Sequence, residues 1–292
     1  MKHIINRARG AGLGISLAAC FSPLAHAQEA PAPHAQPGNW NDTYIGARYS
    51  NDLYFPGSPK KVTQEIGTLT TTGGFKYGNY VFLVDYLVSD GNNPVAGGTT
   101  GAQEIFSRGR VDFSAGKILG HPVGFGVIRD VGLATGFEFA VKNDAMAART
   151  RKLVLGPTVS FAVPRGHWNA TLGWRTENNH NGITRTDVHY KTAAFLESAW
   201  AIPVDLGPAA ALFKGFASIT EPKGLDGFHT QTKTEVLTRM SLLFDAGALT
   251  GNPRTVLLGV GYEYWHNMFG TPASAKAGTR RSAPMLVGEI HF

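Results

Sequence analysis

Aromatic side chains share strand faces with charged side chains in this sequence, and that combination can bind a small solute. Every second residue of a β-strand points to the same side of the sheet. An aromatic ring offers a flat solute a stacking surface, while nearby carboxylate or guanidinium groups hydrogen-bond its polar part. The candidate binding residues are the aromatic Tyr44, Phe106, Phe195 and Trp265, with the charged Asp42, Arg48, Asp85, Glu104, Arg108, Arg110 and Glu263.

The same residues have a second interpretation as structural side chains. Opposite charges on one face pair with each other and hold the wall of a sheet rigid, and aromatic rings fill the space of a narrow interior. Both interpretations stay open at this point. The alternation places further charged residues on the same polar faces: Glu65, Asp112, Glu138, Lys142, Arg175, Glu177, Lys191, Glu197, Lys233, Glu235 and Arg239.

Spacings typical of catalytic, metal or nucleotide sites do not occur in the sequence. There is no H-E-x-x-H, no G-x-S-x-G and no P-loop. The glycine pairs at 124–126 and 259–261 fall in strand-like segments, where they indicate close packing. Histidines occur singly along the segments, without metal-ligand spacing. We therefore predict no catalytic residue, no metal and no cofactor.

Alternating segments must position these side chains. In residues 79–88, bulky apolar residues such as Phe82 and Tyr86 alternate with polar ones such as Asp85. This period of two is typical of strands with one apolar and one polar face. Twelve segments show it: 40–49, 62–71, 79–88, 104–113, 133–142, 153–163, 168–175, 188–200, 213–219, 233–244, 256–265 and 286–292. Strand and turn boundaries are ambiguous in 116–130.

Composition and connections favour a membrane barrel over a soluble sandwich. The chain of 292 residues has 36 glycines, 11% aromatic and 16% charged residues, and no apolar run near the length of a membrane helix. Odd-numbered connections are longer or more polar than most even-numbered ones, as in outer-membrane proteins. Hydrocarbon leaves no partner for an open sheet edge. We predict an all-β fold: a closed antiparallel transmembrane β-barrel of about twelve strands.

The net charge of +6 does not indicate a nucleic-acid-binding protein. Three of the basic residues lie in 1–27, which contains no acidic residue, and the remaining charges are scattered in both signs. Nucleic-acid-binding proteins concentrate positive charge on one face or segment. We therefore exclude nucleic acid as a partner.

The first residues are typical of an export signal. Lys2, Arg7 and Arg9 precede a short apolar stretch, and Ala25-His26-Ala27 fits a cleavage site. We predict a signal peptide over 1–27, a flexible lead-in over 28–39 and the barrel over 40–292, in the outer membrane. An alternative is lipidation at Cys20. The final strand, ending at Phe292, is expected to engage the barrel assembly machinery.

Several stretches resemble a known family. They are Trp40 to Tyr49, Gly78-Asn79-Tyr80 running to Ser89-Asp90, Gly101 to Glu104, Gly156-Pro157 with Val163-Pro164, Gly261 to Trp265, and Glu289 to Phe292. Together they resemble the nucleoside-specific channel-forming outer-membrane family, the Tsx-like channels. The resemblance implies a monomeric twelve-stranded barrel with a narrow lumen that passes nucleosides by facilitated diffusion. It also implies weak binding sites lined by aromatic and ionisable side chains.

The sequence thus predicts a Gram-negative outer-membrane channel, not an enzyme, for small polar solutes such as nucleosides, surrounded by outer-membrane lipids. Two alternatives remain. One is a lipid-modifying hydrolase built from histidine and serine on the barrel wall. The other is a surface-binding barrel that does not conduct.

Overall fold

The computed structural model describes residues 39–206 and 209–292. The predicted signal peptide and, except for Asn39, the predicted lead-in lie outside the described residues. The strands are β1 (Trp40–Leu53), β2 (Val62–Phe75), β3 (Gly78–Ser89), β4 (Gln103–Ser114), β5 (Ile128–Lys142), β6 (Arg149–Phe161), β7 (His167–Asn181), β8 (Thr186–His189), β9 (Ala193–Leu206), β10 (Ala209–Thr220), β11 (Glu235–Asp245), β12 (Val256–His266) and β13 (Arg281–His291). Short helical turns are α1 (Ala115–Leu119), η1 (Gly247–Thr250) and η2 (Met268–Gly270).

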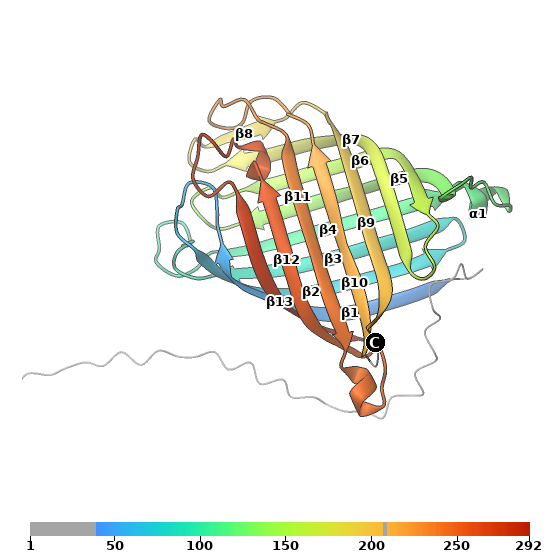
Figure 1. The fold of residues 1–292 in the computed structure, drawn as a ribbon. Helices are drawn as coiled ribbons and strands as arrows, with labels where there is room; N and C mark the ends of the chain where they lie inside the picture. Colours follow the sequence, from blue (N-terminus) through green and yellow to red (C-terminus); the bar gives the residue numbers. More distant parts are fainter. Residues whose placement is uncertain (1–38, 207–208) are drawn as a thin grey trace, which may run out of the picture. The chain divides into compact units, whose positions relative to one another are not determined.

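The strands form one closed antiparallel barrel (Figure 1). Neighbours in the chain pair with each other, and β1 pairs with β13 from Tyr44 opposite His291 to Tyr49 opposite Leu286. That last pairing removes the sheet edges, which hydrocarbon would leave without hydrogen-bond partners. Twelve long strands make up the wall, and the four-residue β8 extends the end of β7 beyond β9. The predicted fold class is confirmed.

Two segments differ from the prediction in detail. The segment predicted as 188–200 is divided into β8 and β9, because the amide of Lys191 donates to Lys223 O in the β10–β11 connection instead of pairing with β7. The ambiguous stretch 116–130 contains α1, whose first turn is capped by the Ser114 side chain accepting from the Lys117 amide. β5 then begins at Ile128.

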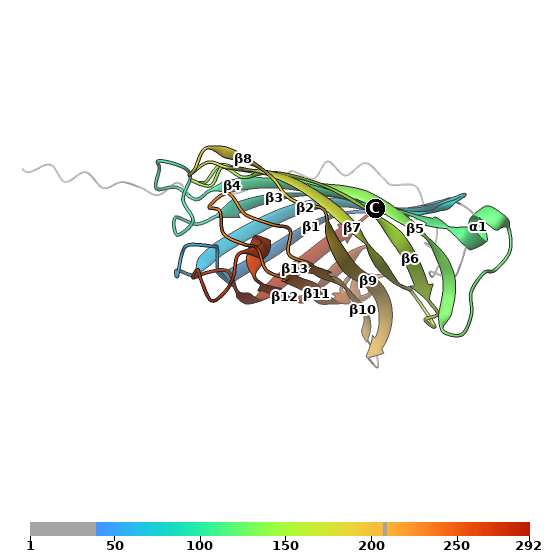
Figure 2. The same ribbon diagram turned by 90° about the horizontal axis from the view of Figure 1, so that it is seen from above.

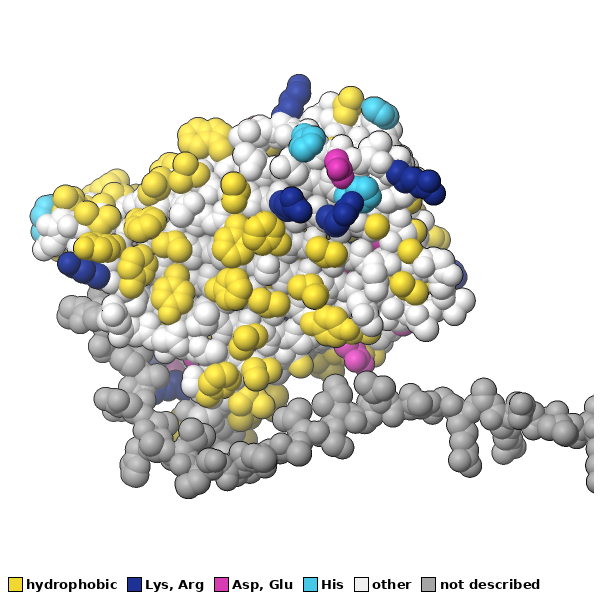
Figure 3. All heavy atoms as spheres, turned by 180° about the vertical axis from the view of Figure 1, so that it is seen from behind, with side chains coloured by type: hydrophobic (Ala, Val, Ile, Leu, Met, Phe, Trp, Pro, Cys, Tyr) yellow, Lys and Arg dark blue, Asp and Glu magenta, His cyan; other side chains and the backbone are white. Residues whose placement is uncertain are grey.

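Large apolar side chains cover the outside of the barrel and acidic side chains lie inside it. Leu153, Leu172 and Val260 are 61%, 61% and 56% exposed, whereas Glu138 and Glu263 are 7% and 0% exposed. Figure 3 shows the hydrophobic side chains spread over one outer face. This arrangement inverts that of a soluble protein and is the one expected in a bilayer.

The two ends of the barrel differ in their connections. Residues 54–61, 90–102, 221–234 and 267–280 connect strands at the end that we call the loop end. The other end, which we call the turn end, holds the start of β1, the end of β13, the two-residue connection 76–77 and α1. Figures 1 and 2 show α1 and the long connections at opposite ends. In the described part of the chain, no helix has the length and apolar character needed to cross a membrane.

Part of the interior is apolar. A buried cluster lies on the inner faces of strands that include β11, β12 and β13, and it consists of Leu53, Val62, Leu243, Leu257, Ala283, Met285 and Val287. This packing was not predicted, since the sequence analysis assigned polar and charged side chains to the inner faces. The ionic side chains described next therefore share the interior with apolar ones.

Candidate functional site in the barrel interior

Ion pairs between β4, β5, β6, β7 and β9 form a cluster inside the barrel, which we call the central cluster. Glu138 of β5 accepts a hydrogen bond from Arg110 at 2.8 Å. The Lys152 ammonium group lies 3.5 Å from its second oxygen, and Arg175 Nη2 lies 3.7 Å from its first. The members of the central cluster are Arg108, Arg110, Glu138, Lys152, Arg175, Glu177, Glu197 and Lys223.

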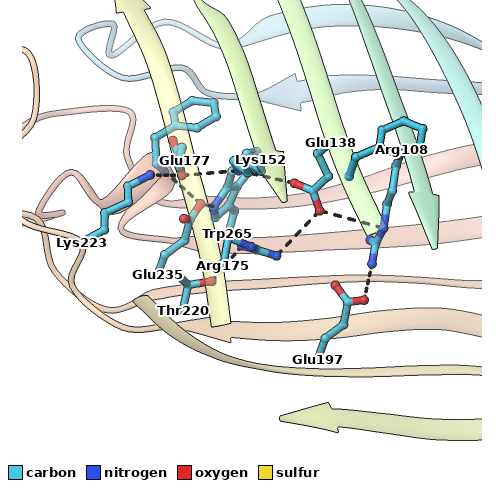
Figure 4. A network of polar contacts seen from close by, with 12 residues as sticks. Arg108, Glu138, Lys152, Arg175, Glu177, Glu197, Thr220, Lys223, Glu235 and Trp265 are labelled. Atoms are coloured by element: carbon cyan, nitrogen blue, oxygen red, sulfur yellow. Dashed lines mark hydrogen bonds and ion pairs between the residues drawn. The ribbon is translucent and has the colours of Figure 1, made fainter. Parts of the chain in front are cut away.

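Arg108 joins walls that are not neighbours in the sheet. It lies on β4 and forms an ion pair with Glu197 on β9, although β5, β6 and β7 separate these strands (Figure 4). Arg110 Nε lies 3.5 Å from the same carboxylate. The Arg108 guanidinium also lies 5.2 Å from the ring centre of Phe216 on β10. Side chains from facing walls therefore meet inside the barrel.

Glu177 extends the central cluster toward the loop end. Its carboxylate pairs with Lys223 of the β10–β11 connection and lies 3.8 Å from Lys152. Arg175 Nη1 donates to the Thr220 hydroxyl at 2.9 Å (Figure 4). The Lys223 ammonium lies 4.2 Å from the ring centre of Tyr190. A connection at the loop end thus contributes directly to the interior network.

Burial makes the members of the central cluster depend on each other. The side chains of Glu177 and Lys223 are only 5% and 4% exposed, and that of Glu138 is 9% exposed. Removing a charge from water costs several kcal/mol, which a well-placed opposite charge offsets. Since five cations share three carboxylates, removal of one carboxylate leaves buried cations without compensation.

A second ionic cluster lies nearer the loop end, around Glu263 of β12. This carboxylate is 0% exposed and pairs with Arg239 and with Arg281, whose Nη1 donates to it at 2.6 Å. Arg281 Nη2 also donates to the Tyr54 carbonyl at 2.7 Å. That bond ties the β1–β2 connection to the first residue of β13.

Phe55 narrows the barrel at the loop end. Its ring centre lies 4.7 Å from the Arg281 guanidinium on β13 and 3.9 Å from the Lys142 ammonium on β5. Gly57 N donates to Ala277 O at 2.8 Å, so the β1–β2 connection is also bonded to the β12–β13 connection. The mouth is therefore lined by an aromatic ring held between two cations.

Trp265, one of the predicted aromatic residues, lies beside this mouth. Its indole Nε1 donates to Glu235 at 2.7 Å, and the Phe269 amide donates to the same carboxylate oxygen at 3.1 Å. The ring centres of Trp265 and Phe269 are 4.8 Å apart, and Arg281 lies 5.5 Å from the indole. The indole is fixed by these contacts and not free in the interior.

A third cluster lies at the turn end and includes the predicted Tyr44 and Asp42. The Lys214 ammonium lies 4.3 Å from the Tyr44 ring centre and 2.6 Å from a Glu289 oxygen. His291 stacks on Tyr44 with ring centres 4.8 Å apart and lies 2.9 Å from Asp42 and 3.3 Å from Glu289. Lys214 reaches this group from β10, across β11 and β12.

The predicted Arg48 and Asp85 form a buried ion pair that bridges β1 and β3. Each keeps a buried atom that has no hydrogen-bond partner among the described residues: Nε of Arg48 and Oδ1 of Asp85. Arg175 Nε in the central cluster is in the same state. Leaving a buried donor or acceptor unpaired costs about 1–3 kcal/mol. These three atoms could each form a hydrogen bond that the described part of the protein does not supply.

The structure does not bring the four predicted aromatic residues together. Tyr44 pairs with His291 and Trp265 with Arg281, at opposite ends of β13. At about 3.3 Å per residue, these levels are about 33 Å apart along the strand. Phe195 is 2% exposed, with the Arg175 guanidinium 5.1 Å from its ring centre. No single ring-shaped solute can therefore contact all four side chains at once.

The remaining predicted residues lie on the inner face, with three exceptions among the wider set. Phe106 and Glu104 are half-buried on β4. Glu65 was assigned to the interior wrongly: it is exposed and pairs with the outward Tyr49, while Gln64 and Ile66 are buried. Lys191 and Lys233 lie exposed in connections at the loop end, also contrary to the prediction.

Sequence reasoning missed several interior side chains. Lys152 and Lys214 alternate with outward apolar neighbours, and that spacing could have identified them. Phe55 and Lys223 lie in connections, where alternation carries no information about which side chain folds into the barrel. Their roles follow only from the closed three-dimensional structure.

Two observations concern other kinds of site. Among the described residues, no group of three or more histidine, cysteine or acidic side chains could hold a metal ion. Among the described residues, the side chains of His121, His180, His189 and His291 bond to a backbone carbonyl, Asp187, Asn178, Asp42 and Glu289, and none of these partners is a serine.

Comparisons with known proteins are consistent with a barrel and carry no argument about function. Neither a protein-family model nor a curated protein sequence matches the chain. The translocator domain of the autotransporter NalP from Neisseria meningitidis is similar at a TM-score of 0.40 and 11% identity, covering 89% of this chain and 91% of that one. The β domain of the Bordetella autotransporter BrkA is similar at 0.37 and 13%, covering 86% and 98%. OpdK from Pseudomonas aeruginosa, solved with vanillate, is similar at 0.25 and 8%, covering 86% and 98%.

The closed wall and the apolar outer face decide the class of protein. The protein is a closed β-barrel of the outer-membrane type. The similarities do not bear on the nucleoside-channel family, so that resemblance stays a prediction.

Proposed function

We propose that this outer-membrane barrel is a narrow channel through which small polar solutes that carry a flat ring, such as nucleosides, diffuse passively. One observation supports it above all others: cations lie on aromatic rings at successive levels of the interior. These pairs are Lys214 with Tyr44, Arg108 and Arg239 with Phe216, Arg281 with Trp265, and Lys142 with Phe55. Arg175 also lies on Phe195, but that ring is buried.

Such pairs suit exchange with a passing solute. A cation–π contact is worth about 0.5–2 kcal/mol, so a nucleobase that takes the cation's place on the ring face replaces only a weak contact, provided that the cation keeps its carboxylate partner. The displaced cation and its carboxylate partner then hydrogen-bond the hydroxyl groups of the sugar. Binding at each level is weak, which conduction requires because a solute must leave as readily as it arrives.

Unused hydrogen-bonding atoms also support a polar solute. Arg48 Nε and Asp85 Oδ1 offer a donor and an acceptor on one ion pair, and Arg175 Nε offers another donor. They are buried, so a hydroxylated solute that displaces neighbouring side chains could satisfy them and recover part of the cost of leaving them unpaired. An apolar solute could not. The resemblance of the strand sequences to nucleoside channels supports the same choice of solute.

Flux through proteoliposomes tests the proposal. We expect the purified barrel to pass adenosine faster than N-acetylglucosamine, a smaller sugar without a flat ring, so that size alone would favour the sugar. Arg108→Ala removes the contacts to Glu197 and Phe216 and should raise the flux of both solutes several-fold while reducing their ratio. Lys61→Ala, at an exposed ion pair with Asp52 in the β1–β2 connection, is the matched control and should change neither flux. If the wild type passes N-acetylglucosamine as fast as adenosine or faster, the protein is a general pore without preference for a flat ring.

A second candidate is a closed barrel that does not conduct. The contacts of Arg108 with Glu197 and Phe216 favour it, because they join facing walls. The same experiment separates the two: a closed barrel passes neither solute in its wild-type form, even if Arg108→Ala opens it.

A further inference from the structure

Basic and histidine side chains gather on the outer wall of the barrel at the loop end, over β6, β7 and β8. Figure 3 shows such side chains at the end of the hydrophobic surface that is opposite α1. We call this group the outer basic patch, and it consists of Arg149, Arg151, His180, Asp187 and His189. Arg149, Arg151 and His189 are exposed, and the His180 side chain is 19% exposed.

Strand pairing places these side chains close together on one face. Arg151 is opposite Asn178, which is opposite His189, so Arg151 and His189 stand two strand spacings apart, about 10 Å. His180 is opposite Asp187 on the next outward row. The amide of Arg149 donates to Asn179 at 3.1 Å, which fixes the first residue of β6 beside β7.

The only carboxylate of the patch is already engaged. His180 Nδ1 lies 2.6 Å from Asp187, and this hydrogen bond lowers the pKa of the Asp187 carboxyl, which therefore stays ionised. His189 Nδ1 lies 2.8 Å from Asn178 Oδ1. Within the described part of the chain, neither Arg149 nor Arg151 forms an ion pair with a carboxylate. Both guanidinium groups are thus exposed without an acid in direct contact, and Arg149 acts on the Asp187 carboxylate only at longer range.

The patch begins where the lipid-facing surface ends. On β6, Leu153 is 61% exposed and is followed on the same face by Arg151 and then Arg149, about 7 Å apart in turn. The neighbours of these arginines across the β5–β6 pairing are Phe139 and Val141, which are 44% and 56% exposed. Trp174, 60% exposed, lies on the adjacent β7. Tryptophan is enriched at the level where lipid headgroups meet acyl chains.

We propose that the outer basic patch binds the phosphate groups of an anionic lipid whose acyl chains lie against the apolar surface of β5, β6 and β7. Guanidinium groups bind phosphate oxygens through paired hydrogen bonds, and the two arginines are spaced to contact one phosphorylated headgroup. On β2, by contrast, the exposed outward charge is the acidic Glu65. The site is separate from the interior and does not depend on conduction.

Native mass spectrometry of the detergent-solubilised barrel tests the proposal, with diphosphoryl lipid A and its dephosphorylated form as probes. We expect the wild type to retain the diphosphoryl lipid and to bind the dephosphorylated form about tenfold or more weakly, as expected for the loss of two charge-assisted contacts. The double variant Arg149→Gln/Arg151→Gln should lose that preference. The matched control Lys60→Gln/Lys61→Gln removes the same charge from the β1–β2 connection at the same end and should keep it.

Four outcomes would overturn the proposal. One is equal binding of both lipids by the wild type. Another is retention of the preference by Arg149→Gln/Arg151→Gln when its heat-modifiable gel mobility shows a folded barrel. The third is full displacement of the lipid by inorganic pyrophosphate, which would show an anion site that does not use the acyl chains. The fourth is binding of an acidic peptide by the wild type in place of lipid, with loss of that binding in Arg149→Gln/Arg151→Gln, which would assign the patch to a protein partner.

Discussion

At the scale of single residues, the interior of this barrel is held by carboxylates that each serve several cations. Glu263 pairs with Arg239 and Arg281, and Glu138 lies within 4.0 Å of cationic nitrogen atoms of four side chains. Such pairs fix the positions of the long basic side chains more than they stabilise the fold, because their desolvation cost is large. Removing the shared carboxylate should therefore be far more costly than removing an exposed one.

Glu263→Gln tests this at the most deeply buried carboxylate. The substitution keeps the shape of the side chain but leaves Arg239 and Arg281 without compensation, so we expect a loss of about 3–5 kcal/mol in the free energy of unfolding. Urea unfolding and refolding of the barrel in lipid vesicles measures it. Glu221→Gln, at an exposed glutamate of the β10–β11 connection, is the control and should change the free energy little. Similar losses for both variants would mean that Glu263 is not the anchor of its cluster.

Residue spacing predicted the side on which a charge lies but not its partner. Asp85 and Glu263 face inward as their alternation with Tyr86 and Tyr262 indicates. The partner of Arg108 is 89 residues away on a strand that is not its neighbour, and only the closure of the barrel brings it near.

At the scale of elements, close contact between strands leaves room for the basic side chains. Gly136 of β5 faces the interior next to Arg110 of β4. A Cβ atom on Gly136 would lie 2.2 Å from the Gly109 carbonyl oxygen and 2.9 Å from Arg110 Nη1. The absence of a side chain there allows the guanidinium group to lie along the wall and reach Glu138 at 2.8 Å.

We expect Gly136→Ala to displace Arg110 and to destabilise the barrel by about 1–3 kcal/mol, as overpacking of a filled interior does. Gly67→Ala is the control, because a Cβ atom at Gly67 meets nothing within 4 Å. Urea unfolding of both variants in the same vesicles compares them. If Gly136→Ala is as stable as Gly67→Ala, Arg110 does not need the space that Gly136 leaves free.

The alternation of apolar and polar residues was least informative about side-chain orientation in segments where that alternation is weak or absent. In β2, Ile66 faces the interior and Glu65 faces outward, because the register with β1 places Glu65 opposite the outward Tyr49. The segment contains several threonines and glycines, so neither face is clearly apolar and the sequence alone leaves the register open. Phe55 and Lys223 reach the interior from connections, for which a period of two predicts nothing.

At the scale of the whole molecule, the apolar outer surface and the ionic network inside have one cause, which is that the bilayer surrounds the barrel wall. The bilayer favours the outward leucine, valine and aromatic side chains, and it also requires closure through β1 and β13. The charged side chains then have no surface left but the interior and the two ends. A charge forced onto the outer surface should therefore be tolerated only beyond the apolar belt.

Val260→Arg places a charge near the middle of β12, on the outer face, where Val260 is 56% exposed. An arginine at the centre of the bilayer costs about 2–4 kcal/mol, and about 0–1 kcal/mol near the interface. We therefore expect Val260→Arg to lower the free energy of unfolding by the larger of these amounts. Thr186→Arg should lower it little, because Thr186 lies exposed on β8 at the loop end. Refolding titrations in vesicles give both values. If the two variants are equally stable in lipid, the outward surface of β12 does not face acyl chains. If the wild-type barrel stays folded and monomeric in detergent-free water, the outer surface is not a membrane surface at all.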